Sequence, residues 1–216
     1  MTGSFKFCTA NVRGLNNVTK RLQVFAWLHS LNASFYFLQE AHCTPACEND
    51  WSRERGGDIY FSHGTSNSRG VCILCNPHVS FSLVDIQRDT DGRVIIMNAI
   101  FSNLYPLTLV NVYAPNKDDP SFFADIKLFL NDPNVSNIIW AGDFNLVMDL
   151  DLDKKGGLSN THFRSRNTLR DIMYDYNLVD TWRYLYPDKP GFTWYSKVTV
   201  GICCRLDFFF VKSSPH

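Results

Sequence analysis

The stretch that decides the fold is NIIWAGDFN, at residues 137–145. Its first half is an apolar run that predicts a buried strand, and Asp143 and Asn145 follow that strand directly. Residues two apart in an extended segment point the same way, so these two polar side chains are expected to share a side while Phe144 turns into the core. Gly142 lets a backbone or a ligand approach closely. The stretch therefore predicts a strand that carries an acid and an amide at its end.

Other strand-like segments also end in polar residues. These ends are Asn11, Gln39–Glu40 and Tyr113. Carboxylate and amide oxygens, such as those of Glu40 and Asn11, suit Mg²⁺ or Mn²⁺ and do not suit zinc. Each residue taken alone is also typical of a turn, a cap or a solvated strand end. The metal-site hypothesis therefore depends on their combination.

Apolar periodicity predicts short strands that alternate with a few helices. The predicted strands are at 5–11, 33–38, 70–75, 93–101, 107–113, 137–141, 193–196 and 205–211. The predicted helices are at 19–31, with Thr19 as N-cap, at 121–130 and at 165–176. This order predicts a layered α/β or α+β fold. No linker divides the chain, so we expect a single domain over 1–216.

Composition excludes several classes of protein. The 216 residues are 45% apolar and 19% charged, which is typical of a globular chain. The formal net charge of zero argues against a polybasic protein that holds nucleic acid by bulk charge, although it leaves room for a local basic patch. The seven irregularly spaced cysteines indicate reduced thiols of an intracellular protein. No apolar run approaches the roughly 20 residues of a membrane span, so we expect no membrane partner.

Five motifs, taken together, resemble those of the endonuclease/exonuclease/phosphatase superfamily, which includes apurinic endonucleases, pancreatic-type deoxyribonucleases and phosphoinositide phosphatases. In chain order they are Thr9-Ala10-Asn11, Leu38-Gln39-Glu40, Asn111-Val112-Tyr113-Ala114-Pro115, Gly142-Asp143-Phe144-Asn145 and Arg205-Leu206-Asp207-Phe208. Each motif alone is a weak signal. All five occur in the family's order and cover nearly the whole chain, which makes the resemblance specific.

Within that superfamily the chain most resembles the endonuclease domain of non-LTR (LINE-type) retrotransposons. The segments with this character are NVRGL at 11–15, QEAH at 39–42, NVYAPN at 111–116, LVDTWR at 178–183 and FTWYS at 192–196. The resemblance implies a four-layer α/β sandwich, in which two packed sheets are flanked by helices and the site lies at one rim. It also implies a parent polypeptide that carries a reverse transcriptase, and action in the nucleus.

The resemblance implies hydrolysis of a DNA phosphodiester with Mg²⁺ or Mn²⁺. Glu40, with Asn11 nearby, would hold the metal, which neutralises charge on the phosphoryl oxygens. Asp143 would orient or deprotonate the attacking water, while Asn145 and Tyr113 would hydrogen-bond the phosphate or the water. In the retrotransposon relatives the nick leaves a 3′-hydroxyl that primes reverse transcription.

One feature departs from the family pattern. The family completes its site with a Ser-Asp-His motif on a last strand, and an acid like Asp207 orients that histidine. Here the sequence ends at His216, which is too close to Asp207 to be carried over as that histidine. We therefore expect a chain that is truncated at its C-terminus and lacks the terminal strand.

Contacts to double-stranded DNA are expected from basic and aromatic residues in loops and at helix starts. The basic candidates are Arg13, Lys154, Lys155, Arg164, Arg166 and Lys197. Thr193, Trp194 and Tyr195 match the segment that lies beside the displaced nucleotide in relatives, where aromatic rings stack on a base. The alternatives are a solvated basic surface for the former and core positions of a strand for the latter.

Three functions remain open on the sequence. The first is a DNA-nicking endonuclease of a retrotransposon, and the second is a phosphatase of the same superfamily. The third is a catalytically impaired fragment that keeps the fold and binds DNA or a partner. A zinc site at His42, Cys43 and Cys47 is disfavoured because the second half of a ligand set is missing.

Overall fold

The sequence forms alternating strands and helices in two units, Met1–Tyr113 and Ala114–His216. The computed structural model describes residues 5–101, 105–130, 137–157 and 162–213. His216 lies outside these described residues. In the described part of the chain, every helix is too short or too polar to cross a membrane.

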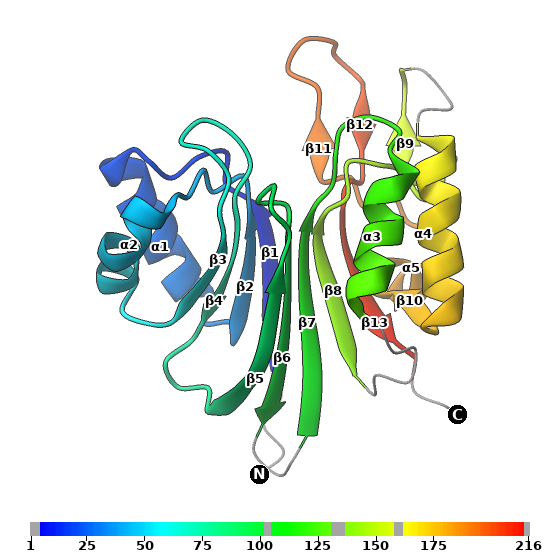
Figure 1. Cartoon of the computed structure of the whole chain (residues 1–216). Coiled ribbons are helices and arrows are strands. Elements are labelled where there is room, and N and C mark those ends of the chain that lie inside the picture. Colours follow the sequence, from blue (N-terminus) through cyan, green and yellow to red (C-terminus); the bar gives the residue numbers. More distant parts are fainter. Residues whose placement is uncertain (1–4, 102–104, 131–136, 158–161, 214–216) are drawn as a thin grey trace. The chain divides into compact units, whose positions relative to one another are not determined.

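The first unit contains a four-stranded sheet in the order β1-β2-β4-β3 (Figure 1). Its strands are β1 (Phe7–Asn11), β2 (Phe35–Gln39), β3 (Ile59–Ser62) and β4 (Val71–Cys75). Strand β1 runs parallel to β2, and β4 runs antiparallel to both of its neighbours. Every residue of β2 and β4 is buried, which explains why both strands are continuous apolar runs rather than alternating patterns.

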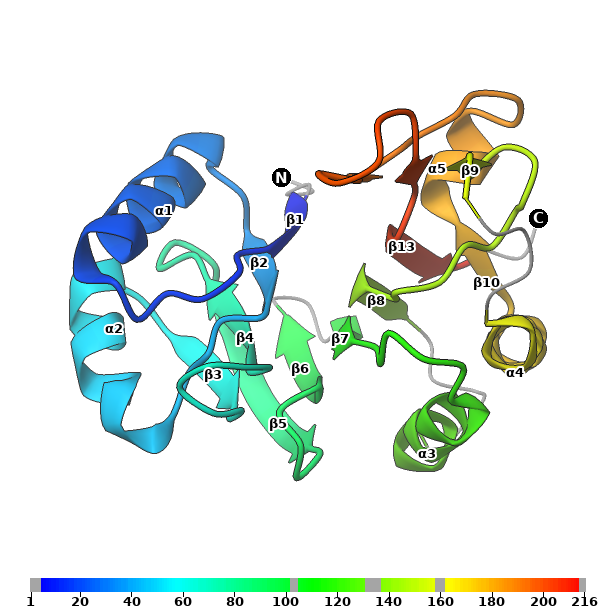
Figure 2. The ribbon, with the colours of Figure 1, turned by 90° about the horizontal axis from the view of Figure 1, so that it is seen from above.

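Two helices cover one face of this sheet (Figure 2): α1 (Val18–Leu31) and α2 (Glu48–Arg55), which follows a short 3₁₀ turn, η1 (Pro45–Cys47). Phe25 of α1 and Trp51 of α2 belong to the core under the helices, together with Tyr36 of β2. The prediction that Thr19 caps α1 is wrong. The helix begins at Val18, so the capping side chain is Asn17, which accepts the Lys20 N–H.

A second sheet packs on the other face of the first one. It contains β5 (Phe81–Arg88), β6 (Val94–Phe101) and β7 (Tyr105–Tyr113), paired antiparallel in that order. The fully buried amide of Asn111 on β7 connects the two sheets. Its Nδ2 donates to the backbone oxygens of Leu38 (3.0 Å) and Cys72 (2.9 Å), and its Oδ1 accepts from Gln39 Nε2 (2.7 Å). One side chain thus ties β7 to both β2 and β4.

The second unit contains the antiparallel strands β8 (Ile138–Asp143), β13 (Asp207–Lys212) and β10 (Leu178–Asp180). Helices α3 (Pro120–Leu130) and α4 (Phe163–Asp175) pack against each other (Figure 1). Phe144 is fully buried and its ring contacts those of Trp140, Phe208 and Phe210, while Phe123 of α3 stacks on it. The expected inward turn of Phe144 is confirmed.

A small sheet in the second unit joins segments that are far apart in the sequence. Strand β12 (Cys203–Cys204) pairs antiparallel with β11 (Trp194–Tyr195) on one side and with β9 (Lys154–Lys155) on the other. Helix α5 (Thr181–Leu185) is capped by Asp180, whose side chain accepts the N–H groups of Trp182 and Arg183.

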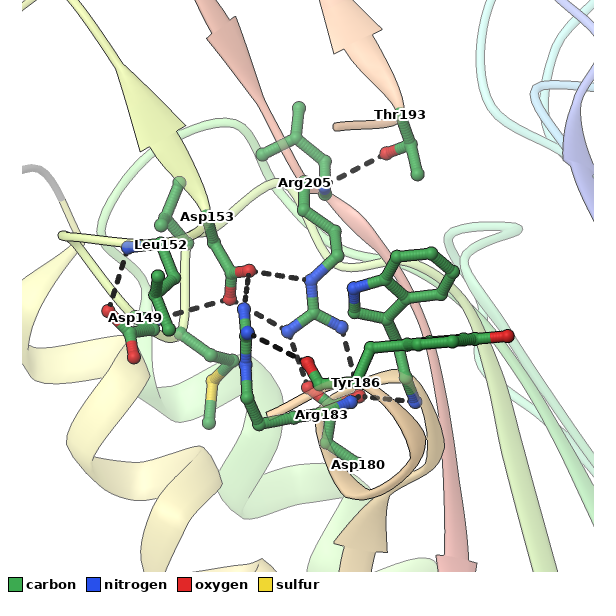
Figure 3. A network of polar contacts seen from close by, with 12 residues as sticks. Asp149, Leu152, Asp153, Asp180, Arg183, Tyr186, Thr193 and Arg205 are labelled. Carbon is green, nitrogen blue, oxygen red and sulfur yellow. Dashed lines mark hydrogen bonds and ion pairs between the residues drawn. The ribbon is translucent and has the colours of Figure 1, made fainter. Parts of the chain in front are cut away.

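A buried ion network holds these segments together (Figure 3). Arg205 donates through Nε and Nη2 to both oxygens of Asp153 (2.8 and 2.7 Å), and through Nη1 and Nη2 to both oxygens of Asp180 (2.9 and 2.5 Å). Arg183 adds a bond to Asp153 (2.5 Å). Asp153 is fully buried and Arg205 is 2% exposed. A planar guanidinium can bind two carboxylates in this bidentate way, whereas an ammonium group cannot.

Charge balance explains why this network tolerates burial. Burial alone lowers the pKa of Arg205, but its hydrogen bonds to the carboxylates of Asp153 and Asp180 outweigh burial and raise the pKa above its usual value. The backbone N–H of Arg205 also donates to the backbone oxygen of Asp153 (2.8 Å). Arg205 therefore links the loop before β9, the start of α5 and the start of β13.

Most predicted elements are confirmed within a few residues, and the strands that the sequence did not predict were missed for two reasons. Strands β3, β10 and β12 have only two to four residues, too few to show a period. Strand β5 is longer but lies at the edge of its sheet, so most of its residues are exposed and its apolar residues form neither a continuous run nor a strict alternation.

We expect Asn111→Ala to lower the free energy of unfolding by about 2–4 kcal/mol, because it leaves buried polar partners unpaired. Urea denaturation followed by tryptophan fluorescence measures the change. Thr108→Val on the same strand is the control, because it removes one hydrogen bond to Asn98 (2.7 Å) and should cost about 1 kcal/mol. Equal losses in the two variants would contradict a special role for Asn111.

We expect Arg205→Met to lower the free energy of unfolding by about 3–5 kcal/mol, since it removes the cation that the buried Asp153 and the partly buried Asp180 share. Arg205→Lys should recover only part of that loss, because lysine cannot reproduce the bidentate geometry. The exposed pair Arg53–Asp50 provides the control, and Arg53→Met should change stability by less than about 0.5 kcal/mol. Full recovery by lysine would show that charge alone holds the network.

Candidate functional site

In the first unit, Asn11 and Glu40 lie at the ends of the parallel strands β1 and β2. Asn11 pairs with Gln39 in the register, and its Nδ2 donates to Glu40 Oε1 at 2.7 Å. Its Oδ1 accepts the Arg13 N–H (3.1 Å). The sequence prediction that these two residues come together is confirmed. The amide nitrogen faces the carboxylate, so in this arrangement Asn11 orients Glu40.

The loop after β1 is held by the first turn of α1. Lys20 Nζ donates to the backbone oxygens of Val12 and Arg13 (2.7 Å each), and Arg21 Nη1 donates to that of Leu15 (3.0 Å). Hydrogen bonds between Arg21 and Glu54 hold the pKa of the Glu54 carboxyl below its usual value. These cations satisfy the carbonyl groups that a tight loop cannot pair within itself.

Glu40 and His42 have left-handed backbone conformations, with φ of 50° and 59°. This geometry turns both side chains out of the path of the strand. His42 Nε2 lies 3.9 Å from Glu40 Oε2, and the side chains are 18% and 27% exposed. A glycine at position 14 allows this packing for two reasons. A Cβ atom there would lie only 2.7 Å from His42 Nδ1, and the φ of Gly14 is +83°, which other residues rarely adopt.

Tyr113 ends strand β7 and is held by Arg93, a residue that sequence reasoning missed. The Arg93 guanidinium lies over the Tyr113 ring at 5.1 Å, and its Nη1 donates to the Tyr113 backbone oxygen (3.1 Å). Burial lowers the pKa of Arg93, yet arginine stays protonated in proteins. The sequence did contain a signal for this contact. The predicted strands 93–101 and 107–113 are neighbours along the chain, and antiparallel pairing places Arg93, at the start of the first, beside Tyr113, at the end of the second.

The first-unit residues fit a hard divalent ion. Among the described residues, no three His, Cys, Asp or Glu side chains form a cage that could hold a metal. Magnesium in proteins commonly takes one or two carboxylates and completes its shell with water and substrate oxygens. A partly exposed, oriented carboxylate such as Glu40 matches that requirement. A direct ligand role for Asn11 stays a prediction.

In the second unit, Asp143 and Asp207 are directly opposed residues of β8 and β13. Opposed residues of an antiparallel pair project from the same side of the sheet. Asp143 is 7% exposed, and its Oδ1 accepts the Asn145 N–H (3.0 Å). Asn145 Nδ2 donates to the Ala114 backbone oxygen (2.8 Å).

The reason why Asp143 and Asn145 lie together differs from the prediction. The strand ends at Asp143, and Asn145 has a left-handed backbone with φ of 49°. A turn closed by the Asp143 carboxylate, rather than an extended segment, therefore brings the acid and the amide together.

Thr193 contacts the start of β13. Its Oγ1 accepts the N–H groups of Leu206 (3.0 Å) and Asp207 (3.2 Å). Together with the Arg205 network, this contact fixes the backbone from which Asp207 projects. The hydroxyl oxygen is thus engaged within the protein, a role that the sequence did not predict for this residue.

The small sheet brings several predicted DNA-binding residues together. Tyr195 pairs with Cys203, and Cys203 pairs with Lys155, so Tyr195 and Lys155 lie in one cross-strand row. Trp194 and Lys154 form the neighbouring row through Cys204. Lys197 is exposed in the loop that follows β11.

The remaining basic residues that were predicted to bind DNA differ in how deeply they are buried. Arg13 and Arg164 are exposed, the first in the loop after β1 and the second in the first turn of α4. Arg166 is 4% exposed, and its Nε donates to the Val147 backbone oxygen (2.6 Å). Its helix position faces the interior, so the structure contradicts a surface role for Arg166.

Comparisons with known proteins identify relatives of this chain. The uncharacterized 149 kDa protein of transposon TX1 from Xenopus laevis is 29% identical over 210 residues, which are 95% of this chain and 16% of that protein. The chain thus spans about a sixth of the length of that relative. The chain is thus similar to a protein encoded by a transposon, in line with the expected resemblance to proteins of mobile elements.

Solved structures share the fold. The AP endonuclease LMAP from Leishmania major has a TM-score of 0.80 at 20% identity, covering 97% of this chain and 79% of its own. The endonuclease domain of TRAS1, a telomere-specific non-LTR retrotransposon, has a TM-score of 0.64 at 16% identity, covering 97% and 85%. The predicted α/β sandwich class is confirmed.

The family assignment follows from the sequence match. A model of the endonuclease/exonuclease/phosphatase family matches residues 8–216, which include all five motifs. The chain therefore belongs to the endonuclease/exonuclease/phosphatase family.

Proposed function

We propose that the chain is a Mg²⁺-dependent DNA endonuclease that nicks one phosphodiester and leaves a 3′-hydroxyl, as in target-site cleavage by a non-LTR retrotransposon. The observation that carries the proposal is the Glu40 carboxylate, held by Asn11 at 2.7 Å and partly exposed beyond the end of a buried strand. The similarity to a transposon protein supports DNA as the substrate.

The first unit supplies electrostatic groups. Glu40 would hold the ion, and Asn11 keeps one carboxylate oxygen fixed. A bound magnesium ion supplies positive charge where negative charge develops on the phosphoryl oxygens. Tyr113 donates its phenolic hydrogen to the phosphate, and the Arg93 cation over its ring makes that phenol a stronger donor.

The second unit supplies the groups that handle water. Asp143 uses Oδ1 to accept the Asn145 N–H, and we assign its Oδ2 to the attacking water, which it orients and from which it accepts a proton. Asn145 has a second amide hydrogen besides the one bound to the Ala114 oxygen, and we assign this hydrogen to the phosphate. Asp207, opposite Asp143, keeps the local charge negative.

The DNA contacts are assigned to exposed and half-buried residues of both units. Arg13 lies in the loop after β1 and Arg164 on α4. The others belong to the small sheet or to the loop after β11, and they are Lys154, Lys155, Trp194, Tyr195 and Lys197, with Thr193 as their backbone support. Lysines bind phosphates, and Tyr195, 63% exposed, offers a ring on which a base stacks. We further propose that the chain works in the nucleus, as part of a longer polypeptide with a reverse transcriptase.

We expect Asp143→Asn and Glu40→Gln each to reduce nicking of supercoiled plasmid by about 10²–10⁴-fold, because each removes a charge used in the reaction. The assay follows conversion to open-circular DNA in Mg²⁺, and EDTA should abolish it. Asp85→Asn, on the exposed face of β5, is the matched control and should nick at the rate of the unchanged chain.

Two results would overturn this proposal. A folded chain that binds duplex DNA in Mg²⁺ without nicking it would instead support a binding-only fragment. Release of phosphate from a phosphoinositide, with plasmid left intact, would support a phosphatase.

We expect Lys155→Ala and Lys197→Ala each to reduce the slope of log Kd against log salt concentration by about 1, the value for one lost phosphate contact. Fluorescence anisotropy with a labelled duplex, in the Asp143→Asn background, measures this slope without cleavage. Lys127→Ala is the control, because that lysine pairs with Asp175 on the helices (2.6 Å). A slope that no lysine variant changes would exclude this sheet as the DNA contact.

A further inference from the structure

His42 lies beside Glu40 without a role in the function proposed above. Its Nε2 is 3.9 Å from Glu40 Oε2, and both side chains are partly exposed. Asn11 donates to the other carboxylate oxygen, Oε1. The Glu40 carboxylate is therefore held from one side by an amide, and its second oxygen is the one nearer the imidazole.

We propose that His42 is a second protein ligand of the divalent ion held by Glu40, and that it makes this site bind Mn²⁺ more tightly than Mg²⁺. The proposal rests on the placement of the ion at Glu40 in the proposed function. Imidazole nitrogen is a good ligand for transition-metal ions, whereas Mg²⁺ strongly prefers oxygen. A carboxylate–imidazole pair therefore discriminates between the two ions in a way that a carboxylate alone does not.

The distance between the two donor atoms supports this assignment. Two donor atoms with ligand bonds of about 2.1 Å lie about 3.0 Å apart when they are adjacent in an octahedral shell. The separation of 3.9 Å is about 1 Å longer than this and is too long for a direct hydrogen bond. A small rotation of the two partly exposed side chains would bring both donor atoms onto one ion, while without it they make only a loose contact.

The backbone that carries both groups is fixed from two sides. The N–H groups of Gly14 and Leu15 donate to the backbone oxygens of Glu40 (2.6 Å) and Ala41 (3.0 Å). On the other side, the N–H groups of Ala41 and His42 donate to Gly70 and Arg69 (2.8 Å each). The left-handed conformations of Glu40 and His42 are thereby held in place before any ion binds.

The packing of Gly14 also sets the direction of the ring. The imidazole edge that carries Nδ1 rests on Gly14, so the opposite edge, which carries Nε2, points toward Glu40. Of the two ring nitrogens, Nε2 is therefore the one we assign as the ligand atom, because it is the one nearer the carboxylate.

The test measures metal binding by the whole chain in the absence of DNA. Electron paramagnetic resonance of free aqueous Mn²⁺ gives its Kd, and displacement by Mg²⁺ gives the second Kd. His42→Gln places an amide oxygen near the position of Nε2. We expect this variant to bind Mn²⁺ about tenfold more weakly and Mg²⁺ within about threefold of the unchanged chain.

Three further variants complete the design. Glu40→Gln should abolish binding of both ions. His42→Ala should weaken Mn²⁺ binding at least as much as His42→Gln does. His78→Gln, at an exposed histidine in the turn after β4, should leave both Kd values unchanged. Far-ultraviolet circular dichroism verifies that each variant is folded.

The outcomes separate the inference from the function on which it rests. If Glu40→Gln abolishes Mn²⁺ binding while His42→Gln leaves the ratio of the two Kd values unchanged, His42 is not a ligand and the proposed function stands. If Glu40→Gln leaves Mn²⁺ binding intact, the ion is not at Glu40, and both the metal placement and the role of His42 are overturned.

Discussion

The buried amide of Asn111 is the interaction on which the first unit depends. Strands β2 and β4 are covered on both faces, so their polar groups must find partners inside the protein. Asn111 reaches across from the second sheet to two backbone oxygens and to Gln39. Because Gln39 immediately precedes Glu40, the amide pair that joins the sheets also fixes the point at which the carboxylate leaves the strand.

The sequence predicted the structure well where a residue type has one main physical role, as apolar residues do in buried strands. Apolar runs predicted the central strands, and the polar residues just beyond them predicted Asn11 beside Glu40 and the pairing of acid and amide at Asp143 and Asn145. These predictions succeeded because β2 and β8 are buried almost throughout, so the polar residues that follow their apolar runs mark the strand ends. A turn at Asn145, rather than the expected extended segment, brings this amide beside the Asp143 carboxylate.

Contacts between distant segments were beyond prediction from one sequence. Arg205 was part of a motif, but its partners Asp153 and Asp180 lie 52 and 25 residues away along the chain, and no local pattern connects them. Arg93 was hidden at the start of a strand, and its position over Tyr113 follows from strand pairing. The predicted surface role of Arg166 was wrong for a different reason. A basic residue near the start of a helix is usually exposed, and the sequence alone does not tell which face of the helix is turned to the interior.

The edge strand β5 has a further consequence for the chain. Its register against β6 shifts between Leu83 and Asp85, so Val84, 61% exposed, is an extra residue opposite the partner strand. Such a bulge twists the strand and interrupts the row of backbone groups that another chain would need to extend the sheet. An apolar side chain can therefore be displayed at a sheet edge without turning that edge into a template for fibrous self-assembly.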